Sequence, residues 1–474
     1  MKTAVIGFPR IGALRELKFS SEKYFRNEIT EEELLETGRT LRKTHWKIQK
    51  EAGIDFISCN DFSYYDGILD AAVMCGIIPK RYQELNLSEL DTYFAMARGY
   101  QGEAGDVKAL AMKKWFNTNY HYIVPEVEDD TVISFSGKKL LSEFEEAKEL
   151  GILVKPVVPG AYTLLKLCRY TGTKTAEDFV DDVILAYKEL LKLCDKNEVS
   201  WIQFDEPSLV FDMTEQDLAL FRKIYFEILP SAQSCQVLVQ TYFGDVRDVY
   251  QDLIQLPFAG VGLDFVEGKQ TKKLIEQYGF PKDKILFAGL VNGKNIWKNH
   301  YKETLQALQE LKEKGIHTVL STSCSLLHVP YTIEQEKELS DEYKKHFAFA
   351  KEKLSELRDL KVLAENENFL DSVLLKVNES LFLAGRDCVK EEVKNRLKQV
   401  KDEDYVRTPA RKERQKRQKE VLGLPIFPTT TIGSFPQTKD VKANRSAYRR
   451  GEKTKEEYVA FNREKISECI RWQE

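Results

Sequence analysis

The sequence lacks the long apolar runs of a membrane protein. It contains no uninterrupted stretch of eighteen apolar residues, which excludes a transmembrane helix of the usual length. The opening segment, residues 1–12, carries glycine and proline where a signal peptide needs an apolar core. We therefore expect a cytoplasmic protein with no membrane partner.

An excess of charge of one sign is also lacking. The chain has 71 basic and 75 acidic side chains, a net charge of −4, and so no bulk attraction to nucleic acid. The run from Arg411 to Lys419 holds six basic residues, which is typical of a nucleic-acid patch or of a solvated connector helix. Because no aromatic residues accompany this run, we favour the helix and expect no nucleic-acid partner.

Closely spaced cysteines are missing too. The eight cysteines are scattered along 474 residues, which indicates reduced thiols and not a disulfide framework. Cys324 and His328 are spaced like metal ligands, but zinc needs three or four ligands and no His-x-Cys or Cys-x-x-Cys pair accompanies them. We therefore predict no metal ligand in this chain.

What the sequence does contain is an alternation of short apolar runs, rich in β-branched residues, with longer amphipathic segments. This alternation predicts parallel strands with helices outside, and about eight units favour a (β/α)8 barrel in the α/β class over residues 1–343. The strand candidates are residues 3–7, 54–58, 152–158, 201–204, 235–240, 260–265, 285–290 and 317–321, with a weaker one at 110–116. Nine candidates are one too many, so one of them is a peripheral hairpin or a false assignment.

Strand signals vanish after residue 343. The segment 344–428 is charged and helical in pattern, and glycine and prolines at 423–428 end it. We predict a charged helical linker over 344–428, which leaves 429–474 as a third part of the chain.

This third part resembles the beginning of the same chain. A second copy of a first strand and first helix is the simplest explanation, because several matches occur at nearly constant offset. The matched pairs, at offsets of 424 to 426 residues, are Ile6 with Ile432, Tyr24 with Tyr448, Thr30 with Thr454 and Gln49 with Gln473. A single βα unit cannot bury its own faces. We therefore expect 429–474 to be the truncated start of a second, duplicated barrel.

Five motifs together are specific, and they span the chain. The sequence resembles the cobalamin-independent methionine synthase family, which implies two face-to-face (β/α)8 barrels, the second of them catalytic and zinc-bearing. The motifs are FPRIGALRELK (8–18), KWFNTNYHYIVPE (114–126), QFDEP (203–207), STSCSLLHVP (321–330) and PTTTIGSFPQT (428–438). The resemblance implies methyl transfer from 5-methyltetrahydropteroyltri-L-glutamate to L-homocysteine, which makes L-methionine.

The same resemblance implies the cofactor and the oligomeric state of the full-length enzyme. The full-length enzyme uses zinc and no cobalamin, and we expect it to be a monomer with small-molecule substrates. The family's second barrel supplies a His and a Cys to zinc from a strand-end phrase. The equivalent phrase here, TYFG at 241–244, has neither. We therefore expect the zinc ligands to be absent and this chain alone to be inactive, with no catalytic residue of its own.

The resemblance also implies binding residues. Arg15, Glu16, Leu17 and Lys18, with Lys114, match the residues that contact the folate triglutamate tail, and Ile432, Gly433 and Ser434 match those that contact homocysteine. From the residues alone, Arg15 and Lys18 suit carboxylates, although an ordinary charged helix start has the same pattern.

Two other functions remain as alternatives. One is a single-barrel hydrolase that uses Asp205 or Glu206 with Asp61, and the other is a non-catalytic polyglutamate-binding module. Adjacent strand residues point to opposite faces, so Asp205 and Glu206 are not expected to act as one pair. We read the FDEP motif as mostly structural. Asn117, Asn119 and His121 are expected to order their loop by hydrogen bonding.

Overall fold

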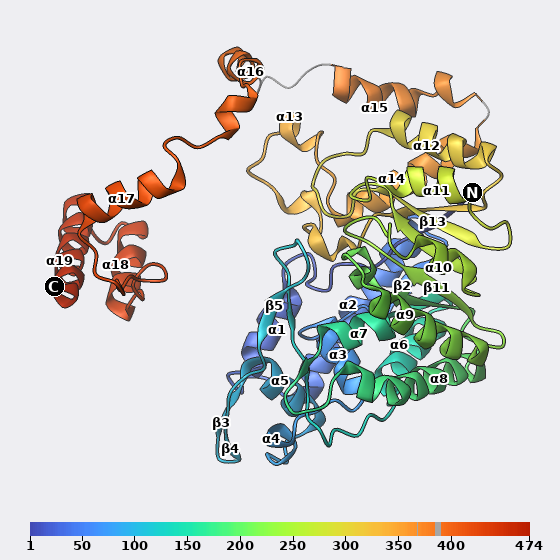
Figure 1. Cartoon of the computed structure of the whole chain (residues 1–474), viewed down its shortest axis with the longest axis horizontal. Helices are drawn as coiled ribbons and strands as arrows, with labels where there is room; N and C mark the ends of the chain where they lie inside the picture. The colour runs from blue at the N-terminus through green and yellow to red at the C-terminus, as the bar shows by residue number, and fades with distance from the viewer. Residues whose placement is uncertain (367, 384–389) are drawn as a thin grey trace. The chain divides into compact units, whose positions relative to one another are not determined.

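The computed structural model describes residues 1–366, 368–383 and 390–474. They form two compact units, the first comprising the described residues up to 383 and the second those from 390 (Figure 1). Each unit is described by itself.

The first unit is built on eight parallel strands. Their order in the sheet is β1-β14-β13-β12-β11-β10-β8-β2, and a parallel bridge between Ala4 and Phe56 links the two ends. The strands are β1 (Lys2–Ala4), β2 (Ile57–Cys59), β8 (Val154–Pro159), β10 (Trp201–Asp205), β11 (Gln236–Gln240), β12 (Gly260–Asp264), β13 (Ile285–Val291) and β14 (Thr318–Thr322). The predicted (β/α)8 barrel is confirmed, since all eight strong strand candidates join this one sheet.

The ninth candidate, at 110–116, is a peripheral hairpin. β5 (Met112–Lys114) pairs antiparallel with β6 (His121–Ile123) outside the barrel sheet. Two further small pairings are antiparallel β3 (Tyr100–Gly102) with β4 (Gly105–Val107) and parallel β7 (Glu126–Val127) with β9 (Arg169–Tyr170).

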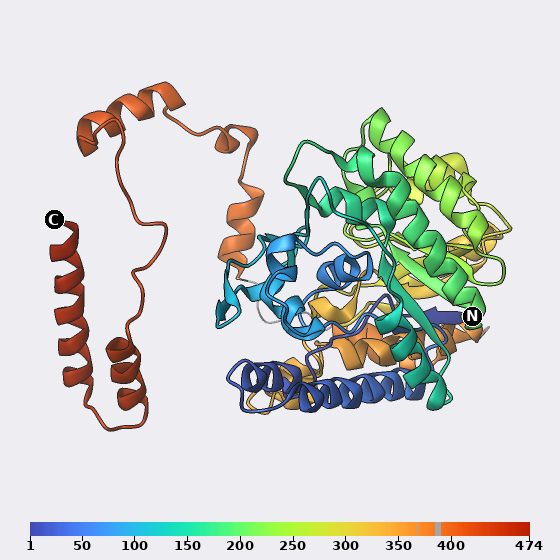
Figure 2. The same ribbon diagram turned by 90° about the horizontal axis from the view of Figure 1, so that it is seen from below.

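Helices surround the barrel (Figure 2). They are α1 (Glu16–Tyr24), α2 (Glu31–Glu51), α3 (Gly67–Met74), α4 (Lys80–Gln83), α5 (Glu89–Arg98), α6 (Lys138–Glu149), α7 (Ala161–Leu167), α8 (Val180–Lys196), α9 (Glu215–Ile228), α10 (Tyr250–Gln255), α11 (Thr271–Tyr278) and α12 (Tyr301–Glu313). In α8, Val183, Tyr187, Leu190 and Cys194 recur every three or four residues and are all fully buried. This spacing puts one apolar stripe against the sheet.

The first unit also includes residues that the sequence places in the linker. After α13 (Asp341–Lys344), helix α14 (Ala350–Glu365) packs on α12, β1, β13 and β14, and α15 (Val373–Leu383) packs on α12. Leu354, Leu357 and Leu360 of α14 are fully buried. Although α14 is rich in charged residues, one of its faces is an apolar stripe that packs on the core. The compact unit therefore continues well past residue 343.

The second unit is helical. It contains α16 (Glu391–Lys398), α17 (Arg411–Leu422), α18 (Lys439–Arg449) and α19 (Lys455–Gln473). α18 and α19 form a hairpin in which Tyr448 stacks on Tyr458 with ring centroids 4.7 Å apart. The basic run 411–419 lies in α17, which has no buried residue.

The helices of the two copies begin in the same way. Thr30 caps α2 in a capping box with Glu33, and Thr454 caps α19 in a capping box with Glu457. The predicted equivalence of Thr30 and Thr454 is therefore reproduced in local structure.

The strand predicted for the second copy is wrong. Residues 429–437 form no strand, and all of 423–438 is exposed. A parallel strand needs neighbouring strands for its backbone hydrogen bonds, and the described part of this unit contains none.

Candidate functional site

The residues Arg15–Lys18 lie where the loop after β1 turns into α1. Arg15 adopts the left-handed conformation, with φ 63°, at the N-cap of α1, and Glu16 accepts a hydrogen bond from the backbone N–H of Leu14 at 3.0 Å. Leu17 is buried against Leu41 in a small apolar cluster. The buried leucine fixes the turn, and the turn keeps Arg15 and Lys18 exposed.

The two cations of this turn share one aromatic neighbour. Both lie near the Phe19 ring, with 6.0 Å from the Arg15 guanidinium carbon to the ring centroid and 5.8 Å from Lys18 Nζ. Lys18 has a loose ion pair with Glu22 at 3.7 Å, whereas Arg15 forms no ion pair within the described residues. The turn therefore presents positive charge to solvent.

Lys114 comes from a different element. It ends β5, its backbone pairs with His121, and its side chain is exposed without an ion pair among the residues that the structure describes. In the adjoining loop, Asn117 donates to Glu267 at 3.1 Å and His121 contacts the carbonyl of Asn119 at 3.1 Å. These contacts agree with the predicted loop-ordering role of Asn117 and His121, whereas Asn119 contributes only its backbone carbonyl.

Ile432, Gly433 and Ser434 lie in the second unit. All three are exposed, and the Ile432 side chain is fully so. The structure thus brings Arg15 and Lys18 together on one turn, and it leaves the homocysteine candidates in an open segment of the other unit.

A cavity of about 550 Å³ opens at the carboxyl ends of the barrel strands. Gly7, Asn60, Asp61, Asp205 and Tyr242, which follow or end four different strands, all line it. This is the end of a (β/α)8 barrel at which active sites gather. Asp61 and Asp205 were predictable from the sequence, but the cavity was not, because its other walls come from loops and helices.

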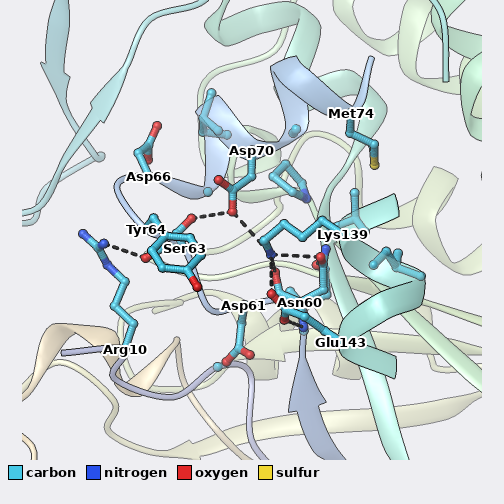
Figure 3. Close-up of a pocket in the computed structure, with 18 of the residues that line it drawn as sticks. Arg10, Asn60, Asp61, Ser63, Tyr64, Asp66, Asp70, Met74, Lys139 and Glu143 are labelled. Atoms are coloured by element: carbon cyan, nitrogen blue, oxygen red, sulfur yellow. Dashed lines mark hydrogen bonds and ion pairs between the residues drawn. The ribbon is translucent and has the colours of Figure 1, made fainter. Parts of the chain in front are cut away.

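One wall of the cavity is a network of ion pairs (Figure 3). Lys139 Nζ contacts Glu143 at 3.2 Å and Asp70 at 3.4 Å, and it donates to the Asn60 side-chain oxygen at 3.0 Å. Beside this network, the Arg42 guanidinium binds Glu146 through two hydrogen bonds of 2.8 and 2.7 Å. Neighbouring charges therefore satisfy these groups, and they stiffen α2 against α6.

The carboxylates at the strand ends are held by donors of the chain. Asp61 accepts from the Phe8 N–H at 2.7 Å and the Ser58 hydroxyl at 2.8 Å. Asp205 accepts from the Gln203 amide at 2.6 Å and the Tyr242 hydroxyl at 3.1 Å. Burial raises the pKa of Asp205 to about 7.

Glu206 faces away from Asp205. It accepts the backbone N–H groups of Tyr162 at 3.0 Å and Thr163 at 2.8 Å, together with the Tyr225 hydroxyl, and it is fully buried. The prediction that the two carboxylates do not act as one pair is confirmed. Glu206 has a structural role, because it satisfies the first turn of α7.

The residues that the structure describes do not fit zinc. No three of their His, Cys, Asp and Glu side chains gather closely enough to hold a metal ion. Cys324 is buried beside Phe243, and burial lowers the pKa of His328 to about 4, which keeps that ring neutral. The seven described cysteines are free thiols, and Cys388 lies outside the described residues. Among the described helices, none is long and apolar enough to cross a membrane.

Two family descriptions match this chain. Residues 2–315 match the model of the cobalamin-independent synthase N-terminal domain, and residues 427–474 match that of the cobalamin-independent synthase catalytic domain.

Curated relatives match over the whole chain. Over 474 residues it is 52% identical to a 5-methyltetrahydropteroyltriglutamate–homocysteine methyltransferase of Campylobacter jejuni subsp. doylei, covering 100% of this chain and 63% of the relative. Over 477 residues it is 52% identical to the protein of the same description from Streptococcus suis, covering 100% of this chain and 62% of the relative. The chain thus spans less than two thirds of the length of these relatives.

Solved structures share the fold. A putative vitamin-B12 independent methionine synthase from Listeria monocytogenes superposes with a TM-score of 0.51 at 17% identity, covering 77% of this chain and 98% of that one. A B12-independent methionine synthase from a Shewanella species superposes with a TM-score of 0.52 at 14% identity, covering 76% and 97%. At such identities these likenesses support the fold alone. The family models and the curated relatives place the chain in the cobalamin-independent methionine synthase family.

Proposed function

We propose that this chain serves the transfer of a methyl group from 5-methyltetrahydropteroyltri-L-glutamate to L-homocysteine, and that its first unit holds the glutamate tail of the donor. The observation that carries the proposal is the exposed cationic turn, where buried Leu17 anchors Arg15 and Lys18. A glutamate tail carries one carboxylate per residue, so neighbouring cations bind a longer tail more tightly than a short one.

In this proposal Lys114 supplies a further cation and the segment Ile432–Ser434 contacts homocysteine. The backbone of Gly433 has open space where a Cβ would stand, which allows a ligand to approach closely. Because the described residues hold no zinc-binding set, the chain's own contribution is binding and orientation. We expect no methionine formation by these 474 residues alone.

The tail-binding role is tested by affinity as a function of tail length. Lys18→Ala and Lys114→Ala should each weaken binding of the triglutamyl folate by up to about fivefold, since an exposed ion pair contributes about 1 kcal/mol or less. Titration calorimetry of the triglutamyl and monoglutamyl forms measures this. Lys23→Ala, at the other end of α1, is the matched control and should leave both affinities unchanged. An equal loss for the two folates would contradict the proposal.

The expected inactivity has its own test. The purified chain is incubated with both substrates and added zinc, and methionine is measured together with bound metal. We expect no methionine and no stoichiometric zinc. Methionine formation, or one zinc per chain that is lost in Cys324→Ser, would overturn this part of the proposal.

A further inference from the structure

The cavity at the strand ends of the first barrel is not used by the proposed tail site. Arg15, Lys18 and Lys114 do not line it. Its volume of about 550 Å³ lies in the range of small-molecule sites, and Met74, Trp115 and Tyr120 add apolar and aromatic surface to its walls. It therefore has the size and the mixed lining of a ligand pocket.

Most charges in this cavity neutralise one another. Lys139 pairs with Glu143, Arg42 pairs with Glu146, and Lys138 pairs with Glu89 at 2.6 Å. Outside such pairs the lining keeps Arg10, Glu31, Asp61, Asp66 and Asp205, so these groups decide which ligand fits.

Arg10 is the cation of the cavity lining that has no ion-pair partner among the described residues. Its guanidinium donates to the Ser63 carbonyl at 2.7 Å and lies 3.5 Å from the Tyr120 hydroxyl, but no carboxylate lies within 4.0 Å among the described residues. Burial opposes the charge of Arg10, but longer-range attraction to Tyr120 and Tyr93, and then to Asp66 and Asp70, raises its pKa overall. A half-buried guanidinium with no carboxylate partner suits a ligand carboxylate.

Some carboxylates of the cavity lining also lack a charged partner. Asp61 and Asp205 form no ion pair within the described residues, and each is held only by uncharged donors. Burial raises the pKa of both carboxyl groups, and the Asp61 charge adds to the rise for Asp205, which the buried Lys155 offsets in part. A ligand ammonium placed against these two carboxylates would stabilise their charged forms, which burial disfavours.

We propose that this cavity binds a free α-amino acid with an apolar side chain, its carboxylate on Arg10 and its ammonium on Asp61 and Asp205. Opposite unmatched charges at two places in one cavity favour a zwitterion over a simple anion or cation. The apolar walls accommodate the side chain. This inference does not depend on the proposed tail site or on the homocysteine segment.

L-Leucine is the probe, because it has no thiol or thioether for a homocysteine site to recognise. Titration calorimetry should give saturable binding of L-leucine. Isoamylamine, which lacks the carboxylate, and 4-methylpentanoate, which lacks the ammonium, should each bind at least about tenfold more weakly. Equal binding of either analogue, or no saturable binding of L-leucine, overturns the proposal.

Variants of Arg10 and Asp205 test which residue binds the carboxylate of the ligand and which binds its ammonium. Arg10→Gln keeps a donor for Ser63 and should weaken L-leucine at least about tenfold, while Arg10→Lys should recover part of the affinity. Asp205→Asn should weaken L-leucine and isoamylamine together but leave 4-methylpentanoate unchanged. Lys18→Ala is the control outside the cavity and should bind L-leucine normally. Thermal melting of each variant separates lost binding from lost folding.

Proton release is a second readout. Bound ammonium lowers the pKa of Asp205, which faces Lys155, Asp61 and Tyr242, so leucine binding near pH 7 should release protons. Calorimetry in buffers of different ionisation enthalpy measures the release, and Asp205→Asn should reduce it. If triglutamate displaces L-leucine, the cavity belongs to the tail site and the proposal is wrong.

Discussion

At the scale of single residues, the structure separates two carboxylates that are neighbours in the sequence. Asp205 borders an open cavity, whereas Glu206 is sealed among two backbone N–H groups and a tyrosine hydroxyl. Burial raises the pKa of both to about 7. Only Glu206 is enclosed by the protein on all sides, so its titration is coupled directly to folding.

Glu206→Gln tests that coupling. The native pKa of Glu206 lies above its unfolded value of 4.5, so its contribution to stability is fully present below about pH 4.5 and is lost as the pH rises through 7. The glutamine variant lacks this titration. It should therefore be less stable than the parent at pH 5, and the difference should shrink by on the order of 2 kcal/mol by pH 8. Urea unfolding at both pH values measures it.

The matched control is Asp252→Asn, an exchange on the outer face of the barrel in α10. A pH-dependent difference of the same size there would show that the effect is a general charge effect. A constant difference for Glu206→Gln between pH 5 and 8 would contradict the assigned burial.

The strand-end acids were predictable because each follows an apolar run, so their place at one end of the barrel follows from the fold. Arg10 and Lys139 were not predictable. One lies in a loop and the other in the first turn of α6, and only the folded chain brings them to one cavity. No motif or residue spacing in the sequence indicates that these two side chains lie at the same cavity.

At the scale of elements, the two copies of the repeat have helices that begin with the same capping motif. Thr30 and Thr454 each accept a hydrogen bond from the backbone N–H of a glutamate three residues on, at 3.3 and 3.2 Å. In return, the carboxylate of each glutamate accepts a hydrogen bond from the threonine backbone N–H, at 2.7 and 2.8 Å. The same four-residue signal therefore begins α2 in the barrel and α19 in a helical hairpin.

Alanine at the two caps should give matched effects. Thr30→Ala should lower the free energy of unfolding of the first unit by about 1 kcal/mol, and Thr454→Ala should lower that of the second unit by a similar amount. Chemical denaturation followed by circular dichroism and hydrogen exchange separates the units. No change in either variant would mean that the caps contribute nothing beyond what water supplies.

Helix α14 tests where the first compact unit ends. Leu357 is fully buried, whereas Val362 of the same helix is 58% exposed. Leu357→Ala should cost about 2–5 kcal/mol of barrel stability, and Val362→Ala should change it by less than about 0.5 kcal/mol. If both variants melt like the parent, α14 is only loosely attached.

The strands of the barrel were predictable from their β-branched runs. Helix α14 was expected in the linker, whereas it packs on the barrel. Its Lys and Glu residues have the composition of a solvated helix, and two of them, Lys353 and Glu356, are buried all the same. Composition describes a whole segment, whereas packing depends on one face. The leucines at every third position were the signal for that face.

At the scale of the whole molecule, the two units differ in how they are stabilised. The first closes its strands into a barrel with a continuous core, and the second has helices whose described residues bury almost no side chains beyond Asn444. Stability is therefore unevenly distributed along the chain.

Hydrogen exchange should report this difference. Amides of residues 430–474 should exchange far faster than those of β10 and β11, because few buried contacts protect them. Exchange detected by mass spectrometry after proteolysis resolves the segments. Equal protection of both would show that the second unit is an independently stable fold.

The stretch 423–438 has a consequence for handling the protein. Ile426, Phe427 and Ile432 are 88%, 89% and 110% exposed on a backbone without strand or helix. Apolar side chains on open backbone attract like segments of other molecules. We therefore expect these few residues to contribute more to self-association at high concentration than the small net charge of the chain does. Static light scattering should give attractive interactions that Ile432→Lys weakens, so the same substitution raises solubility without touching the barrel.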